Sequence, residues 1–165
     1  MEKKYTISVL VDNESGVLTK VTGLFARRGY NIESLAVGET TSKDLSRITV
    51  IVSGDDLVVD QICKQLAKLI NVKTVKVLEE KTYVGRELVF IKVSANASKR
   101  AQIIQFVEIF RANIVDVAAK TLTIEISGDS DKIDAFRNLL EPFGILEIVR
   151  TGMIAIQRGE ACVER

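Results

Sequence analysis

Residues 13–18 (NESGVL) have the types and spacing best suited to binding a small polar ligand. They precede a predicted helix, and the start of a helix offers unpaired backbone N–H groups and a partial positive charge to a carboxylate or phosphate. Gly16 removes the side chain where a ligand would approach the backbone, and Asn13 adds a donor and an acceptor. The same residues also fit a structural role, in which Asn13 or Ser15 caps the helix and Gly16 relieves a tight turn.

The residue types that the sequence lacks exclude several other kinds of chemistry. There is no histidine, which rules out an imidazole base, a histidine metal ligand and a Ser-His-Asp triad. Cys63 and Cys162 form no CxxC pair, and we expect Cys63 to be a packing residue in a helix. The GxxxxGK[ST] pattern of a phosphate loop is also missing. We therefore expect no catalytic residue, no metal site and no cofactor in this chain.

Hydrophobic periodicity predicts the elements that must position residues 13–18. Strands alternate apolar and polar residues with period two, whereas helices repeat apolar residues every three or four positions and often end at glycine, here Gly29. The predicted elements are a strand over 5–11, a helix over 17–28, a hairpin of strands over 32–40 and 48–52, a helix over 59–70 and a strand over 72–77. The order is βαββαβ.

The second half of the sequence repeats this order. Its predicted elements are a strand over 84–95, a helix over 98–110 capped by Ser98, a hairpin over 114–117 and 122–126, a helix over 133–140 and a strand over 145–156. The motif Ser-Gly-Asp closes the third strand of both halves, at residues 53–55 and 127–129. We therefore predict an α+β chain of two ferredoxin-like βαββαβ domains, residues 1–79 and 80–165, each an antiparallel sheet with two helices on one face.

Composition narrows the classes of partner. The formal net charge is +1, without the basic excess that nucleic-acid binding normally requires. No uncharged apolar run approaches the roughly 20 residues that span a bilayer, and the N-terminus does not resemble a signal peptide. We therefore expect a cytoplasmic protein with no nucleic-acid or membrane partner. Because 47% of the residues are hydrophobic, we also expect the second face of the sheets to be covered.

One long block of the sequence is similar to a known family. Residues 13–35, NESGVLTKVTGLFARRGYNIESL, resemble the opening of the regulatory (small) subunit of acetolactate synthase, also called acetohydroxyacid synthase. That family begins with an ACT domain, a βαββαβ amino-acid sensor. The resemblance continues through residues 45–50, 108–111, 134–136 and 150–152 and covers nearly all 165 residues. Asn13 stands where ACT domains in general have Asp, and an Asn avoids a second negative charge beside a bound carboxylate.

The resemblance implies a function and a site. The chain would activate a separate catalytic subunit, which uses thiamine diphosphate, Mg and FAD, and would confer feedback inhibition by valine in branched-chain amino-acid biosynthesis. Two copies would pair through their ACT domains, with valine at the interface. The helix start would offer backbone N–H groups to the valine carboxylate, Asn13 would bind its polar end, and the second strand of the partner chain would hold the ammonium and the side chain. The residues that the resemblance assigns to the site are Asn13, Gly16, Val17, Leu18, Asn31 and Ile32.

Other functions remain as alternatives. Small phosphatases share the βαββαβ order, but they need an arginine in the anion loop, and here Arg27 and Arg28 lie at the far end of the helix from Gly16. RNA-binding domains of this topology stack bases on aromatic residues of the sheet, whereas most phenylalanines here fall on predicted helices. A free-standing amino-acid sensor that acts on another partner is the main alternative, although no helix-turn-helix segment supports a role in transcription.

Overall fold

The computed structural model describes residues 3–164, which form two compact α+β units. The first contains the chain up to Val84 together with the stretch from Met153, and the second is Gly85–Gly152. Each has a βαββαβ arrangement with an antiparallel sheet, so the predicted fold class is confirmed. The units differ from the predicted domains, 1–79 and 80–165, because the C-terminal stretch packs with the first unit.

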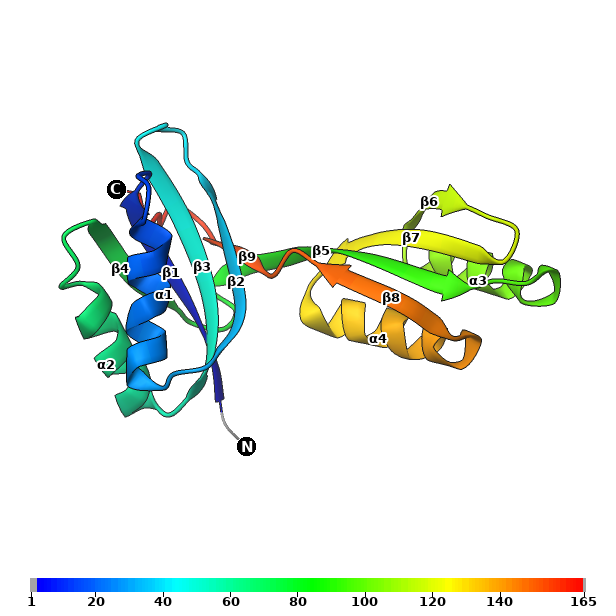
Figure 1. Cartoon of the computed structure of the whole chain (residues 1–165), viewed down its shortest axis with the longest axis horizontal. Helices are drawn as coiled ribbons and strands as arrows, with labels where there is room; N and C mark the ends of the chain where they lie inside the picture. Colours follow the sequence, from blue (N-terminus) through cyan, green and yellow to red (C-terminus); the bar gives the residue numbers. More distant parts are fainter. Residues whose placement is uncertain (1–2, 165) are drawn as a thin grey trace. The chain divides into compact units, whose positions relative to one another are not determined.

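The first unit places two helices on one face of a four-stranded sheet, as Figure 1 shows. Its elements are β1 (Lys3–Asp12), α1 (Val17–Arg28), β2 (Ile32–Glu39), β3 (Leu45–Gly54), α2 (Asp56–Leu66) and β4 (Val72–Leu78). The strand order is β2-β3-β1-β4, and Ile7 of β1 lies opposite Val50 of β3 and Val77 of β4. The end of central strand β1 therefore leads directly into the loop before α1.

The apolar faces of the sheet and of the two helices pack together to form the core of this unit. The odd-numbered residues of β1 turn toward the helices, where Ile7 and Val9 are fully buried. They pack with Val21 and Phe25 of α1 and with Ile62 of α2. This packing fixes where α1 begins and which of its residues point away from the sheet.

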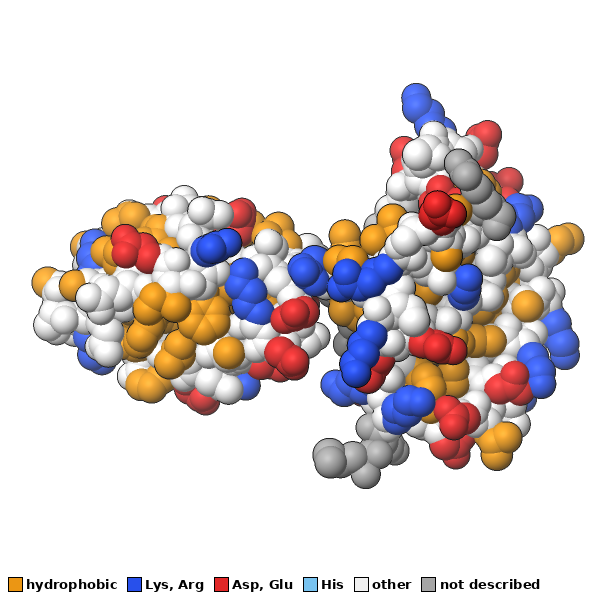
Figure 2. Space-filling model, turned by 180° about the vertical axis from the view of Figure 1, so that it is seen from behind, with side chains coloured by type: hydrophobic (Ala, Val, Ile, Leu, Met, Phe, Trp, Pro, Cys, Tyr) orange, Lys and Arg blue, Asp and Glu red, His pale blue; other side chains and the backbone are white. Residues whose placement is uncertain are grey.

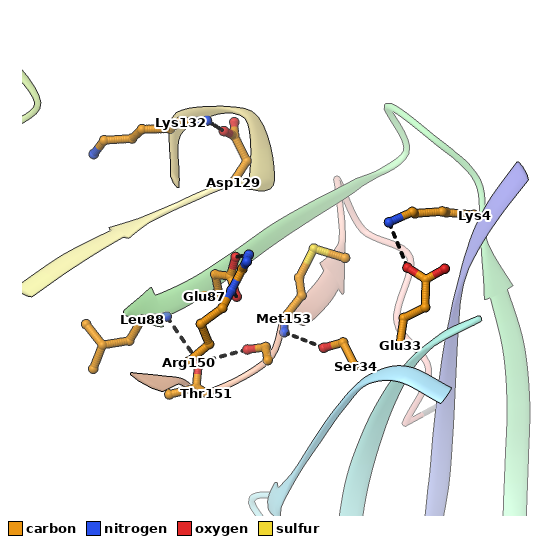
Figure 3. Close-up of polar contacts among 11 residues, drawn as sticks. Lys4, Glu33, Ser34, Glu87, Leu88, Asp129, Lys132, Arg150, Thr151 and Met153 are labelled. Atoms are coloured by element: carbon orange, nitrogen blue, oxygen red, sulfur yellow. Dashed lines mark hydrogen bonds and ion pairs between the residues drawn. The ribbon is translucent and has the colours of Figure 1, made fainter. Parts of the chain in front are cut away.

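The second unit repeats the topology of the first. Its sheet has the order β6-β7-β5-β8. The elements from this point on are β5 (Tyr83–Ser94), α3 (Ala97–Ile109), β6 (Asn113–Val117), β7 (Thr121–Gly128), α4 (Ser130–Leu140), the 3₁₀ helix η1 (Glu141–Phe143), β8 (Ile145–Arg150) and β9 (Ile154–Gln157). Glu87 of β5 is buried and paired with Arg150 of β8, so an ion pair joins these neighbouring strands, as Figure 3 shows.

The repeated Ser-Gly-Asp motif has the same role in both units. The Asp55 carboxylate accepts a hydrogen bond from the Val58 N–H at 2.8 Å, and the Asp129 carboxylate accepts one from the Lys132 N–H at 2.9 Å. Each aspartate therefore caps the second helix of its unit. The cap predicted for α3 was wrong: Asn96 rather than Ser98 is the N-cap residue.

Two further predictions of element boundaries were wrong. The single strand expected over 145–156 is two strands, because Gly152 adopts a left-handed backbone with φ of 81°, through which a strand cannot continue. The helix expected over 59–70 ends at Leu66, and Ile70 is 88% exposed. Ile70 fits the apolar spacing of a helix, but it lies beyond the end of α2 and its side chain is not part of the core.

The chain's own C-terminal stretch covers the outer face of the first sheet. We call residues 153–164 the C-terminal cover. Its Ala155 and Val163 are buried in a small cluster with Leu78 of β4. The backbone N–H of Met153 donates to the Ser34 hydroxyl at 3.1 Å, as Figure 3 shows. The predicted covering of the sheet thus comes, in this unit, from a segment remote in sequence.

The arrangement of charge and apolar surface agrees with the composition. On the face in Figure 2, acidic and basic side chains are interspersed, as expected for a net charge of +1. Along the described residues, none of the helices combines the length and apolar character that crossing a membrane takes.

Candidate functional site

The start of α1 differs from the starts of the other helices. Gly16 is the N-cap residue with φ of 83°, a left-handed conformation that glycine adopts without strain. Among residues 3–164, no side chain caps α1, whereas Asp55, Asn96 and Asp129 cap α2, α3 and α4. An α-helix leaves its first N–H groups without an intrahelical partner. The start of α1 therefore lacks a side-chain cap, and the contact there is the backbone hydrogen bond from the Val17 N–H to the Glu14 carbonyl at 3.3 Å.

The residues of the first turn leave this position open. The turn contains no acidic side chain, so nothing within it repels a carboxylate. Val17 is 3% exposed and belongs to the core, and its backbone N–H donates to the Glu14 carbonyl at 3.3 Å. Leu18 is 39% exposed and lies on the side of the helix away from the sheet. The apolar wall expected from Val17 is thus absent, while Leu18 is available for that role.

Asn13 is held by the hairpin that connects β2 and β3. Its amide nitrogen donates to the Lys43 carbonyl at 2.8 Å and to the Glu39 carboxylate at 3.2 Å. Its amide oxygen accepts a hydrogen bond from the Ser46 hydroxyl at 3.0 Å. Asn13 therefore ties the end of β1 to this hairpin, a contact that the sequence reasoning missed. The carbonyl oxygen keeps a second lone pair for a ligand.

Asn31 and Ile32 lie far from these residues within one chain. They come at the start of β2, beyond the C-terminal end of α1, whereas Asn13 and Gly16 lie before its N-terminal end. The 12 residues of α1 span about 18 Å. Asn31 is exposed and Ile32 is half-buried against the core. A single chain does not bring the two groups of predicted site residues together.

A polar network supports the loop that leads to Gly16. Asn71, at the start of β4, contacts the side chains of Asp12, Glu14 and Lys20. The Lys73 ammonium lies 2.9 Å from the Asp12 carboxylate, and together with the Asn71 amide it holds the pKa of Asp12 below its usual value. The sequence reasoning missed Asn71, because no local pattern marks a contact across so many residues.

The described residues contain no cluster for a metal ion and no activated thiol at Cys63. Over residues 3–164, no group of three or more His, Cys, Asp or Glu side chains could hold a metal ion. Cys63 is half-buried in α2, where burial and the nearby Asp60 raise the pKa of its thiol and so disfavour the thiolate. Cys162 is exposed.

Comparison with known proteins identifies the family. Residues 7–74 match the model of the ACT domain of acetohydroxyacid synthase small subunits, and residues 86–159 match the model of the small subunit of acetolactate synthase. The acetolactate synthase small subunit of Mycobacterium bovis is 50% identical over 157 residues, covering 95% of this chain and 94% of that protein. A probable small subunit of Archaeoglobus fulgidus is 53% identical and covers 94% of this chain and 98% of that protein.

A solved structure agrees with these relatives. The crystal structure of the acetolactate synthase small subunit of Thermotoga maritima superposes with a TM-score of 0.89 and 42% identity, covering 96% of this chain and 99% of that one. The first unit is therefore an ACT domain of the type found in these small subunits. The chain belongs to the family of acetolactate synthase small subunits, as the resemblance of residues 13–35 predicted.

Proposed function

We propose that this chain activates an acetolactate synthase catalytic subunit and makes it sensitive to feedback inhibition by valine. The observation that carries this proposal is the similarity of both units, over 94% or more of the chain, to proteins named as small subunits of that synthase. Branched-chain amino-acid biosynthesis in the cytoplasm is the setting that this function implies. The carbon–carbon bond is formed on the catalytic subunit, which would hold the thiamine diphosphate, Mg and FAD.

The start of α1 is the proposed binding position of the valine carboxylate. The helix start has no side-chain cap, its partial positive charge suits a negative group, and Gly16 lets that group approach the backbone. Asn13 lies beside this position and has a carbonyl oxygen for the ammonium. A zwitterion needs donors at one end and acceptors at the other, and this end of the unit supplies both.

The rest of the site would come from a second copy of the chain. Asn31 and Ile32 are separated from Gly16 by the length of α1, so they complete a site only when two ACT domains pair. Leu18 from one copy and Ile32 from the other would then form apolar walls around a small branched side chain. Discrimination against leucine, by one methylene, amounts to about 1–3 kcal/mol, so leucine at high concentration should bind weakly.

A ligand that bridges two chains also provides a means of regulation. Valine can shift the assembly only through a difference in its affinity for two states, and a contact with both copies creates that difference when the copies move. The coupling is reciprocal for binding: if valine changes the affinity of this chain for the catalytic subunit, that subunit changes the valine affinity by the same factor.

The proposal is tested by mixing the purified chain with its catalytic subunit. We expect the chain alone to form no acetolactate, the mixture to exceed the rate of the catalytic subunit alone, and valine to lower the rate of the mixture. Calorimetry of the chain against the common amino acids shows which ligand it binds. The proposal would be contradicted if adding the chain, with or without valine, left the rate of the catalytic subunit unchanged. Valine binding in that case would favour a free-standing sensor with another partner.

A further inference from the structure

We propose that Asn71 is a positioning residue for the amino-acid site, because it restrains the two carboxylates that precede Gly16. This inference rests on the proposed function, which places a carboxylate at the start of α1. Asn71 does not contact that position itself. It acts through Asp12 and Glu14, which lie at the end of β1 and in the following loop.

Asn71 is a buried polar residue whose hydrogen-bonding groups are engaged. It is 8% exposed, and its amide nitrogen donates to the Asp12 carboxylate at 3.2 Å and to the Glu14 carboxylate at 3.4 Å. Its amide oxygen accepts a hydrogen bond from the Lys20 ammonium at 2.9 Å. The backbone carbonyl of Asn71 also accepts a hydrogen bond from the backbone N–H of Asp12 at 2.9 Å. One side chain thus connects β1, the loop before Gly16 and the first turns of α1.

The chemistry of these contacts requires an amide. Two N–H donors face two carboxylates, and one carbonyl faces an ammonium. An aspartate has the same size but offers acceptors to Asp12 and Glu14 instead of donors. A leucine would leave both carboxylates without this partner.

The restraint on Glu14 protects the binding position from competition within the chain. A carboxylate near a helix N-terminus is stabilised by the helix dipole, and Glu14 lies two residues before Gly16. Freed from Asn71, its side chain would compete with a ligand carboxylate for the same N–H groups or repel it. Lys20 and Lys73 lower this repulsion further, because each places an ammonium within 2.9 Å of an atom of the network.

The test uses the full chain with L-valine as the probe, and calorimetry as the measurement. We expect Asn71→Asp to weaken valine binding by about tenfold or more, since it replaces two hydrogen bonds to charged groups with charge repulsion. Asn138→Asp, on the exposed surface of α4, adds the same charge elsewhere and should leave the affinity unchanged.

Two further variants distinguish positioning from a general loss of stability. We expect Glu14→Gln to restore most of the valine affinity when it is added to Asn71→Asp, because it removes the carboxylate that Asn71 restrains. Lys20→Met should weaken binding by roughly threefold or more, since Asn71 loses its partner. Lys20 is exposed, so this variant keeps the inference testable if Asn71→Asp does not fold.

The outcomes separate this inference from the proposed function. If the unaltered chain does not bind valine, the proposed site is wrong and this inference is wrong with it. If the unaltered chain binds valine, while folded Asn71→Asp or Lys20→Met binds equally well, the inference alone is overturned. Failure of Glu14→Gln to restore any affinity in a folded double variant also contradicts it.

Discussion

At the scale of single residues, the candidate site depends on one backbone conformation. Gly16 has φ of 83°, which an L-residue adopts at a cost of about 1–2 kcal/mol. A Cβ at Gly16 would meet no atom within 4 Å, so space does not prevent a side chain there. The glycine is needed for its conformation and for the open approach to the N–H groups of α1. Two substitutions of equal size at Gly16, one charged and one neutral, therefore separate the effect of charge from the effect of backbone strain.

We predict that Gly16→Asp abolishes the response to valine, whereas Gly16→Asn retains much of it. Both side chains have the same size and both bear the backbone strain. Only aspartate places a charge near the ligand carboxylate, and two like charges about 4 Å apart cost about 4 kcal/mol at an effective dielectric of 20, roughly a thousandfold in affinity. Calorimetry with valine measures the difference. Equal affinities for the two variants would mean that no carboxylate binds at the start of α1.

At the scale of elements, the first unit depends on a segment from the other end of the chain. Arg47 of β3 donates to the Ser8 hydroxyl and to the Glu164 carboxylate, and Val163 is buried in a cluster with Leu78 and Ala155. The C-terminal cover therefore contributes both a buried apolar contact and an ion pair to the ACT domain. A fragment that ends after β4 would lack both.

We predict that Val163→Ala lowers the free energy of unfolding by roughly 1.5–3 kcal/mol, because it removes two buried methyl groups at about 0.8 kcal/mol each and leaves a cavity. Val163 is 3% exposed, and the truncation leaves a space beside Leu78. Denaturant-induced unfolding measures the change. Cys162→Ala, at the exposed neighbouring residue, is the control and should leave stability unchanged. Equal stability of the two variants would mean that burial of the Val163 side chain contributes nothing to the stability of the fold.

At the scale of the whole molecule, the proposed valine site is incomplete in one chain. The first group of site residues lies just before α1 and in its first turn, and the second group follows the helix. A helix of 12 residues is too long for one amino acid to bridge, because it spans about 18 Å. In the arrangement proposed above, two copies would pair with the start of one α1 near β2 of the other, which would complete two equivalent sites.

We predict that two defective chains form one intact site when they are paired. A Gly16→Asp chain co-purified with an Asn31→Ala chain, using different tags, contains one site with both defects and one with neither. We expect valine to bind this mixed dimer with the affinity of the unaltered protein but at half the stoichiometry. The Asn31→Ala homodimer should bind about 5- to 150-fold more weakly, for one lost partner of a charged group. A mixed dimer without a tight site would place the whole site within one chain.

The sequence by itself determined the elements and their order, because these depend on local physics. Alternation in β1 and helical spacing in α1 are set by residues a few positions apart, and Gly16 marks the start of α1 in the same local way. The resemblance of residues 13–35 likewise identified the family. The same local reasoning gave wrong boundaries at Ile70 and around Gly152, where an apolar side chain was exposed and a backbone turn interrupted a strand.

Only the tertiary structure decided what supports the site and what covers the sheet. Asn13 meets Ser46, Asn71 meets Asp12 and Glu14, and Val163 meets Leu78 across long stretches of sequence. Such contacts depend on strand register and on the packing of the complete chain, because a shift of one residue turns every side chain of a strand to the other face. A periodic pattern indicates which face of an element is apolar, but it does not indicate which remote residue will meet it.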